Sequence, residues 1–185
     1  MNQHHFLDFA IKTAKSSGDI LLNYFGNISS FQQKSSNIDL LTKADLESEA
    51  FILKQIDKKF PDHQIITEES SAKKGTSKYR WVIDPLDGTT NFVHNLPIFA
   101  VSLGLQYEEQ TILGVVYNPA ADKCFWATKN GGAFLNGNSI KPSSTNTLSK
   151  SLLVTGFPYI HDNSWEKCFD IFKAFYKESQ GVRRL

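Results

Sequence analysis

The chain of 185 residues contains two cysteines, one methionine and six prolines, and it has no long apolar run. Cys124 and Cys168 are too few for a disulfide framework, so we expect reduced thiols in a cytoplasmic protein. No apolar run approaches the roughly 20 residues that a membrane-spanning helix needs. The N-terminus also lacks a basic segment followed by an apolar core, so we expect no secretory signal there. These absences argue against membrane proteins and small disulfide-stapled proteins.

The charge is balanced, with 20 basic and 19 acidic residues and a formal net charge of +1. Proteins that bind nucleic acids neutralise phosphates with clusters of lysine and arginine. Here only the short pairs Lys73-Lys74 and Arg183-Arg184 stand out. We therefore expect neither a nucleic acid nor a membrane as partner. The hydrophobic content of 41% is ordinary for a globular protein.

Apolar residues recur at helical spacing in three segments, which predicts helices over residues 6–25, 43–60 and 164–178. Short apolar runs bounded by turn residues predict strands over 63–67, 79–84, 100–107, 111–118, 123–128 and 152–155. The three consecutive strands in the middle predict an antiparallel meander. Helices followed by a run of strands favour an α+β fold, in which the helices form a layer on a sheet.

A segment rich in proline, serine, threonine and asparagine covers residues 141–150 and is the best candidate for a domain boundary. We expect an N-terminal α+β domain over residues 1–146, which carries the functional site. Residues 147–185, with one predicted strand and one predicted helix, then start a C-terminal α/β domain.

The most informative segment is residues 84–90, Asp-Pro-Leu-Asp-Gly-Thr-Thr, which directly follows an apolar run at 80–83. Proline cannot donate to a sheet ladder, so we expect Pro85 to end the strand. Gly88 permits a tight turn, and Thr89 then opens a helix. The backbone N–H groups at the start of a helix attract phosphate, so this segment predicts a phosphate site.

Three carboxylates, on Glu68, Asp84 and Asp87, each end or follow a predicted strand. If those strands are neighbours, the carboxylates converge and repel one another unless a cation intervenes. An all-oxygen ligand set favours Mg²⁺, Mn²⁺ or Ca²⁺ over Zn²⁺. A metal site and a phosphate site this close together predict phosphate-ester chemistry.

Simpler roles are open for the same residues. Aspartate and glycine after a strand are common turn residues. Thr89 fits the cap of the following helix, and Thr42 with Asp45 fits a capping box at the start of the second helix. The ordered combination of Asp45, Glu68-Glu69 and the 84–90 segment favours the functional interpretation.

Residues 81–92, Trp-Val-Ile-Asp-Pro-Leu-Asp-Gly-Thr-Thr-Asn-Phe, closely resemble the signature of the inositol monophosphatase family. Three further segments match that family in order: 39–45 (Asp-Leu-Leu-Thr-Lys-Ala-Asp), Glu68-Glu69 and 131–137 (Gly-Gly-Ala-Phe-Leu-Asn-Gly). The resemblance covers nearly the whole chain. It implies a layered αβαβα sandwich of the inositol monophosphatase and fructose bisphosphatase type, with incomplete C-terminal layers.

The resemblance also implies a set of metal ligands. It places Glu68, Asp84 and the Leu86 carbonyl on one Mg²⁺, and Asp84 with Asp87 on another, in a site for two or three ions. Family members have a later Trp-Asp-x-Ala-Ala-Gly motif with a further metal-binding aspartate. Because the chain ends at Leu185 before such a motif, we interpret it as part of a longer protein. Without that aspartate, the second metal is expected to bind weakly.

The resemblance assigns catalysis and phosphate binding to neighbouring residues. Thr89 and Asp45 are expected to orient the attacking water beside the ligand Glu68. Phosphate oxygens are expected to meet Asp87, Gly88, Thr89 and Thr90. Glu69 and Lys34 are expected to lie next to the metal ligands and to position them without contacting the metal.

The implied reaction is Mg²⁺-dependent hydrolysis of a phosphate monoester by a metal-activated water, with inositol 1-phosphate as the first choice of substrate. Fructose bisphosphate, histidinol phosphate and 3′-phosphonucleotides are alternative substrates. A non-catalytic regulatory binding module is an alternative of a different class. The resemblance further implies inhibition by lithium and a homodimer of the full-length protein.

Overall fold

The computed structural model describes residues 3–26, 31–33, 40–68, 72–157 and 163–184. The chain divides into two compact units, Met1–Ile140 and Lys141–Leu185. The division falls at the start of the segment 141–150 that we expect to connect two domains, while the exact domain bounds stay a prediction. None of the described helices is long and apolar enough to cross a membrane.

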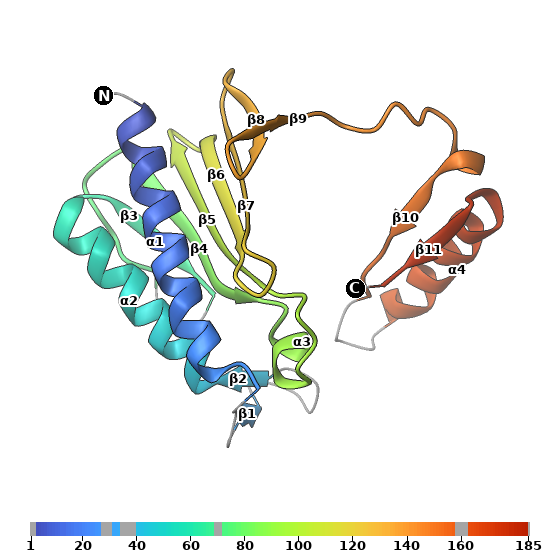
Figure 1. The fold of residues 1–185 in the computed structure, drawn as a ribbon, viewed down its shortest axis with the longest axis horizontal. Coiled ribbons are helices and arrows are strands. Elements are labelled where there is room, and N and C mark those ends of the chain that lie inside the picture. Colours follow the sequence, from blue (N-terminus) through green and yellow to red (C-terminus); the bar gives the residue numbers. More distant parts are fainter. Residues whose placement is uncertain (1–2, 27–30, 34–39, 69–71, 158–162, 185) are drawn as a thin grey trace. The chain divides into compact units, whose positions relative to one another are not determined.

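The first unit is built on a seven-stranded sheet in the order β3-β4-β5-β6-β7-β8-β9 (Figure 1). Its strands are β3 (Gln64–Thr67), β4 (Tyr79–Asp87), β5 (Ala100–Tyr107), β6 (Gln110–Asn118), β7 (Lys123–Thr128), β8 (Gly132–Leu135) and β9 (Asn138–Ile140). β3 runs parallel to β4, and each later pair of neighbours is antiparallel. The predicted antiparallel meander is therefore confirmed.

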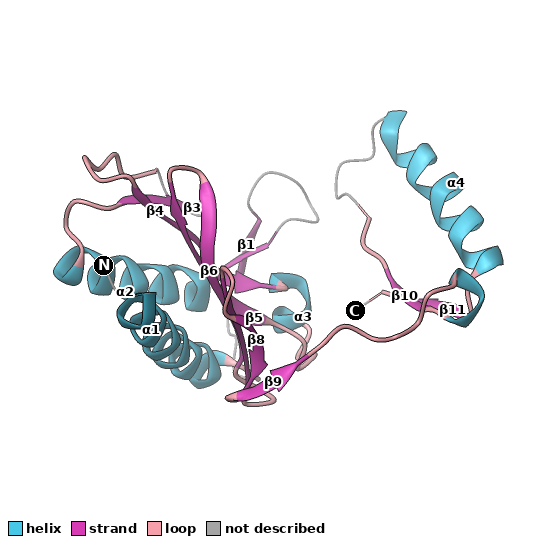
Figure 2. Ribbon diagram, turned by 90° about the horizontal axis from the view of Figure 1, so that it is seen from above, coloured by secondary structure: helices cyan, strands magenta, loops and turns pink. Residues whose placement is uncertain are grey.

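Two long helices, α1 (Gln3–Tyr24) and α2 (Lys43–Lys59), lie along one face of this sheet (Figures 1 and 2). α1 packs on β5, β6 and β7, and α2 packs on β4. A short helix, α3 (Thr89–Val93), follows β4, and β1 (Phe31–Gln33) pairs with β2 (Leu40–Thr42) in a separate ribbon. A helical layer on a mixed sheet confirms the α+β class.

The core lies between the two helices and the sheet because both present apolar residues with the right period. α1 buries Phe6, Ala10 and Ala14, which recur every four residues and so share one side of the helix. In the regular part of β4, Trp81 and Ile83 are buried and alternate with more exposed neighbours, and Pro85 and Leu86 of the motif are also buried. Burial of each large apolar side chain stabilises the fold by about 1.5–3 kcal/mol. The opposite face of β4 is left for the motif carboxylates.

The strand that carries the motif is longer than predicted. β4 continues through Pro85 to Asp87, so the expectation that Pro85 ends the strand is wrong. The pairing of β4 with β5 shifts between Asp84 and Asp87, which marks a bulge. A bulged residue is outside the hydrogen-bonded ladder, so the missing N–H of proline is tolerated there.

The second unit contains β10 (Leu152–Val154), α4 (Asn163–Glu178) and β11 (Gly181–Arg183), after one turn of 3-10 helix, η1 (Leu148–Lys150). β10 and β11 pair in parallel, and α4 is the crossover between them. The predicted strand and helix agree with β10 and α4 to within one residue at each end. β11 was not expected, because three residues carry too little apolar pattern to be recognised.

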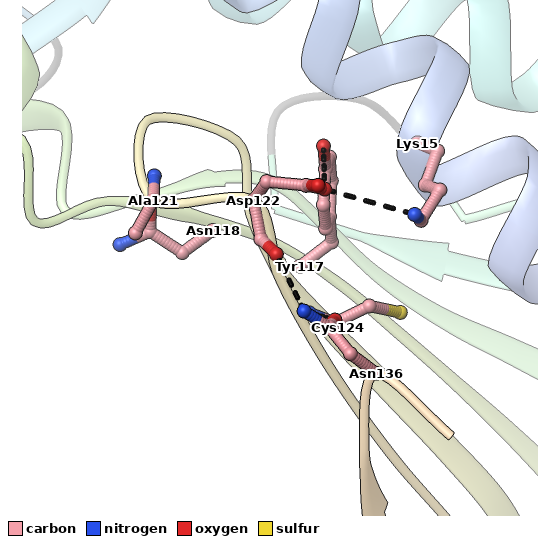
Figure 3. Close-up of polar contacts among 7 residues, drawn as sticks. All are labelled: Lys15, Tyr117, Asn118, Ala121, Asp122, Cys124 and Asn136. Atoms are coloured by element: carbon pink, nitrogen blue, oxygen red, sulfur yellow. Dashed lines mark hydrogen bonds and ion pairs between the residues drawn. The ribbon is translucent and has the colours of Figure 1, made fainter. Parts of the chain in front are cut away.

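A polar cluster fixes the hairpin between β6 and β7 against α1 (Figure 3). The Tyr117 hydroxyl donates to Asp122 Oδ1 at 3.1 Å, and Lys15 Nζ lies 3.7 Å from the same oxygen. Asn136 accepts the N–H of Cys124 at 2.8 Å and donates to the Asp122 carbonyl at 2.8 Å. Burial and the hydrogen bond to Asp122 raise the pKa of Tyr117 to about 12, so its hydroxyl is a constant donor at neutral pH.

A buried histidine, His63, lies in the aromatic part of the core. Its ring stacks on Tyr79 with 5.0 Å between centroids, and its Nδ1 accepts the indole N–H of Trp81 at 3.1 Å. Burial lowers the pKa of His63 from its ordinary value of 6.5, while the charge of Asp62 opposes this effect and that of Lys73 adds to it. The folded protein therefore holds a neutral imidazole at neutral pH.

We expect acid to destabilise the fold through His63. Because its folded pKa is lowered, the unfolded state binds more protons once the pH falls below about 6.5, and the free energy of unfolding decreases. Above about pH 6.5, His63 is neutral in both the folded and the unfolded state, so its protonation no longer lowers the free energy of unfolding. Urea unfolding at several pH values between about 7.5 and 5 measures this slope. The His63→Gln variant should show a shallower slope, and equal slopes would contradict the assignment.

Candidate active site

The bulge in β4 sets the direction of the two motif aspartates. Asp84 pairs with Ser102, and Asp87 pairs with Ala100, so three steps along β4 match two steps along β5. Ala100 and Ser102 are two residues apart and share one face of the sheet, and residues that pair across strands also share a face. Asp84 and Asp87 therefore lie on the same face, whereas a regular strand would point them in opposite directions.

Register also brings Glu68 next to Asp84. Thr67, the last residue of β3, pairs in parallel with Ile83 of β4, so the residues that follow them, Glu68 and Asp84, are also neighbours. Asp87 and Glu68 are exposed and Asp84 is partly buried. The structure thus brings together, at one end of the sheet, the backbone positions of all three carboxylates expected to bind metal.

Hydrogen bonds within the motif fix the loop that links β4 to α3. Asp84 Oδ1 accepts the N–H of Leu86 at 3.1 Å, and the Thr89 hydroxyl donates to the Leu86 carbonyl at 3.0 Å. The N–H of Phe92 donates to the Gly88 carbonyl at 3.0 Å. Asp84 and Thr89 are therefore both tied to the backbone at Leu86, which was expected to bind metal through its carbonyl.

Thr89 does not cap α3, so that simpler role is wrong. The cap position is Gly88, which has φ 87° and ψ 35° and makes no side-chain cap hydrogen bond. A left-handed residue turns the chain so that Thr89 becomes the first helical residue, and its hydroxyl reaches back to Leu86. A Cβ at Gly88 would also lie 3.0 Å from the carbonyl oxygen of Ile98, so both conformation and space require glycine.

α2 is docked on the motif through polar residues of its first two turns. Ser48 donates to the Pro85 carbonyl at 3.0 Å, and its hydroxyl lies 2.5 Å from that of Ser17 on α1. Asp45 is one turn earlier on the same side of α2 and is only 1% exposed. Asp45 therefore lies on the buried side of α2 that faces the motif. The capping box of Thr42 and Asp45 stays a prediction, because the structure does not describe the side chain of Thr42.

The donor chemistry of the site fits a hard divalent cation. Carboxylate and carbonyl oxygens from Glu68, Asp84, Asp87 and Leu86 are the ligands that Mg²⁺ and Ca²⁺ take. The Leu86 carbonyl has two lone pairs, and Thr89 uses one of them. Within the described part of the chain, no three histidine, cysteine, aspartate or glutamate side chains are grouped closely enough to hold a metal ion. The metal ligand set accordingly stays a prediction.

Two expected site residues, Lys34 and Glu69, lie outside the described residues. Sequence reasoning, in turn, missed Ser48, Glu49 and Thr67, which connect α2 to the strand ends. A signal for two of them was present in the sequence. Ser48 and Glu49 stand at positions that continue the buried stripe of α2, where apolar residues are expected.

Comparisons with known proteins agree with this fold. The model of the inositol monophosphatase family matches residues 2–185. The chain is 39% identical over 180 residues to the inositol-1-monophosphatase of Synechocystis sp., and 41% identical over 184 residues to the Nus factor SuhB of Escherichia coli. The solved structure of extragenic suppressor protein SuhB from Bartonella henselae matches with a TM-score of 0.92 at 31% identity. The chain belongs to the inositol monophosphatase family, and its layered α+β fold is the fold of that family.

The matches cover nearly all of this chain but only part of each relative. They include 97% of this chain and 63% of the Synechocystis protein, and 98% of this chain and 68% of the E. coli protein. For the Bartonella structure the shares are 97% and 70%. The chain thus spans about two thirds of the length of these relatives.

Proposed function

We propose that this protein hydrolyses a phosphate monoester in a Mg²⁺-dependent reaction, with inositol 1-phosphate as substrate. The observation that carries the proposal is the bulge in β4, which directs Asp84 and Asp87 to one face of the sheet with Glu68 beside Asp84 in register. The relative named inositol-1-monophosphatase supports this choice of substrate.

Glu68, Asp84, Asp87 and the Leu86 carbonyl are the groups that would hold the metal. When bound, Mg²⁺ lowers the pKa of a coordinated water and neutralises charge on the leaving oxygen. The Leu86 N–H donates to Asp84 Oδ1 at 3.1 Å and so ties this carboxylate to the backbone of the motif. Asp84 is therefore held in one orientation before any ligand arrives, which reduces the entropy lost on binding.

Thr89 is suited to orient the attacking water. Its hydroxyl hydrogen is donated to the Leu86 carbonyl, so the Thr89 oxygen is left as an acceptor. An acceptor beside the metal ligands can hold one hydrogen of a water and direct a lone pair toward phosphorus. Asp45, buried on the side of α2 that faces the motif, is the expected second acceptor.

The phosphate would be bound by backbone N–H groups where the chain turns from β4 into α3. Gly88 has a left-handed conformation and Thr89 and Thr90 begin the helix, so their N–H groups belong to the unsatisfied first turn. Glycine at the turn also lets a ligand approach the backbone closely.

The chemistry requires no covalent intermediate. Cys124 is 3% exposed on β7, and burial raises the pKa of its thiol, so it is a protonated core residue and not a nucleophile. The nucleophile proposed here is a water activated in the carboxylate site, which would attack phosphorus in line with the leaving oxygen.

The test is phosphate release by the purified full-length protein that contains this chain, with and without Mg²⁺. We expect turnover of inositol 1-phosphate that EDTA abolishes and added Mg²⁺ restores. The same assay with fructose bisphosphate, histidinol phosphate and a 3′-phosphonucleotide distinguishes the alternative substrates. Absence of release from all four at saturating Mg²⁺ would refute the phosphatase proposal.

A relative named Nus factor SuhB favours a second candidate, a binding module that acts through a protein partner. On this proposal the Asp87→Asn variant keeps its partner in a pull-down from cell extract. Inhibition by lithium and a homodimer of the full-length protein are further predictions that follow from the family resemblance, and a cytoplasmic location is a prediction from the low cysteine content.

A further inference from the structure

Glu49 is a carboxylate in a place where a helix would normally have an apolar side chain. It is 4% exposed, on the side of α2 that also buries Ile52 and Ile56. Glutamate is rarely buried without a partner, because removal of its charge from water is costly. Its presence in the buried stripe therefore needs a reason other than core packing.

The contact that Glu49 makes points to the end of β3. Its carboxylate accepts the hydroxyl of Thr67, the last residue of that strand. Thr67 directly precedes Glu68, which is next to Asp84 in the register of β3 and β4. The hydrogen bond therefore restrains the backbone from which a predicted metal ligand projects.

The neighbouring residue of α2 does the same for β4. Ser48 donates to the carbonyl of Pro85, within the bulge between Asp84 and Asp87. One turn of α2 thus holds both strand ends that carry the predicted ligands. Because Ser48 and Glu49 are on one rigid helix, they fix the two strand ends relative to each other.

We propose that Glu49 is a positioning residue of the divalent-cation site, acting through Thr67 to fix the direction of Glu68. The proposal rests on the proposed function, since it takes Glu68 as a metal ligand. A carboxylate suits this role because its hydrogen bond with a hydroxyl donor is stronger than the bond that the same hydroxyl makes to a side-chain amide oxygen.

The test compares four variants of the full-length protein by calorimetric titration with Mg²⁺ alone, without substrate. Glu49→Gln keeps the shape of the side chain, Glu49→Ala removes it, and Thr67→Val removes the donor at constant shape. Glu47→Gln is the matched control, because Glu47 also accepts a hydroxyl, that of Tyr24 on α1, but is exposed on another side of α2. The unfolding free energy in EDTA is measured for each variant.

We expect Glu49→Gln and Thr67→Val to weaken Mg²⁺ binding by about 10- to 100-fold, the range for groups that orient metal ligands. The Mg²⁺ concentration for half-maximal phosphate release should rise by the same factor, with kcat at saturating Mg²⁺ nearly unchanged. Glu47→Gln should bind Mg²⁺ like the unmodified protein. If a variant is less stable but its Mg²⁺ affinity is unchanged, Glu49 has only a structural role and the proposal is wrong.

The two proposals fail in different ways. An unmodified protein that releases no phosphate refutes the proposed function, whereas an active protein whose Mg²⁺ affinity is the same in Glu49→Gln and Thr67→Val refutes only the role of Glu49. If Glu49→Ala does not fold, Thr67→Val still tests the role of Glu49. Valine keeps the β-branched shape that suits the end of a strand, so this variant is expected to fold.

Discussion

Replacement of Asp87 by asparagine in the full-length protein is expected to lower Mg²⁺-dependent phosphate release by more than about 100-fold, since even groups that only orient metal ligands account for 10- to 100-fold. Asp87 ends β4 on the same face as Asp84, and the resemblance gives it contacts with both metal and phosphate. Asparagine has the same shape but no charge, so it is a weaker ligand for a hard cation.

The fold is expected to tolerate this change. Asp87 is exposed, and surface substitutions away from special contacts change the free energy of unfolding by about 0.5 kcal/mol or less. Asp19→Asn, on an exposed position of α1, is the matched control and should keep full activity. Near-normal turnover of a folded Asp87→Asn protein at saturating Mg²⁺ would rule out the role assigned to Asp87.

Replacement of Trp81 by alanine is expected to have the largest effect on stability, with a loss of about 3–5 kcal/mol in the free energy of unfolding. Trp81 is fully buried, its ring contacts Phe9 and Phe60, and its indole N–H donates to His63. Alanine would leave a cavity between α1 and β4 and remove the donor to a buried imidazole. Urea unfolding measures the change.

Two neighbouring variants separate the contributions of Trp81. Trp81→Phe keeps an aromatic ring but leaves the His63 acceptor without the indole donor, so we expect an intermediate loss of about 1–3 kcal/mol. Val82→Ala is the control, because Val82 is 38% exposed on the opposite face and should change stability by less than about 1 kcal/mol. Similar losses for Trp81→Ala and Val82→Ala would contradict the core described above.

Much of the fold follows from local pattern. The spacing of Phe6, Ala10 and Ala14 is enough to predict α1, because one buried side of a helix needs apolar residues every three to four positions. Alternation in β5 and β6, with turn residues between them, is enough to predict the antiparallel meander. The segment 84–90 identifies the candidate site, since its carboxylates, glycine and threonines each suit metal or phosphate chemistry.

The sequence by itself determined the helices, the meander, the family resemblance and the location of the candidate site. Only the tertiary structure decided that Pro85 lies within β4, because the bulge depends on pairing with β5, which is distant in sequence. The bulge in turn decided that Asp84 and Asp87 share a face. The contacts of Ser48 and Glu49 were also decided by tertiary structure, because their partners Pro85 and Thr67 are distant in the sequence from α2.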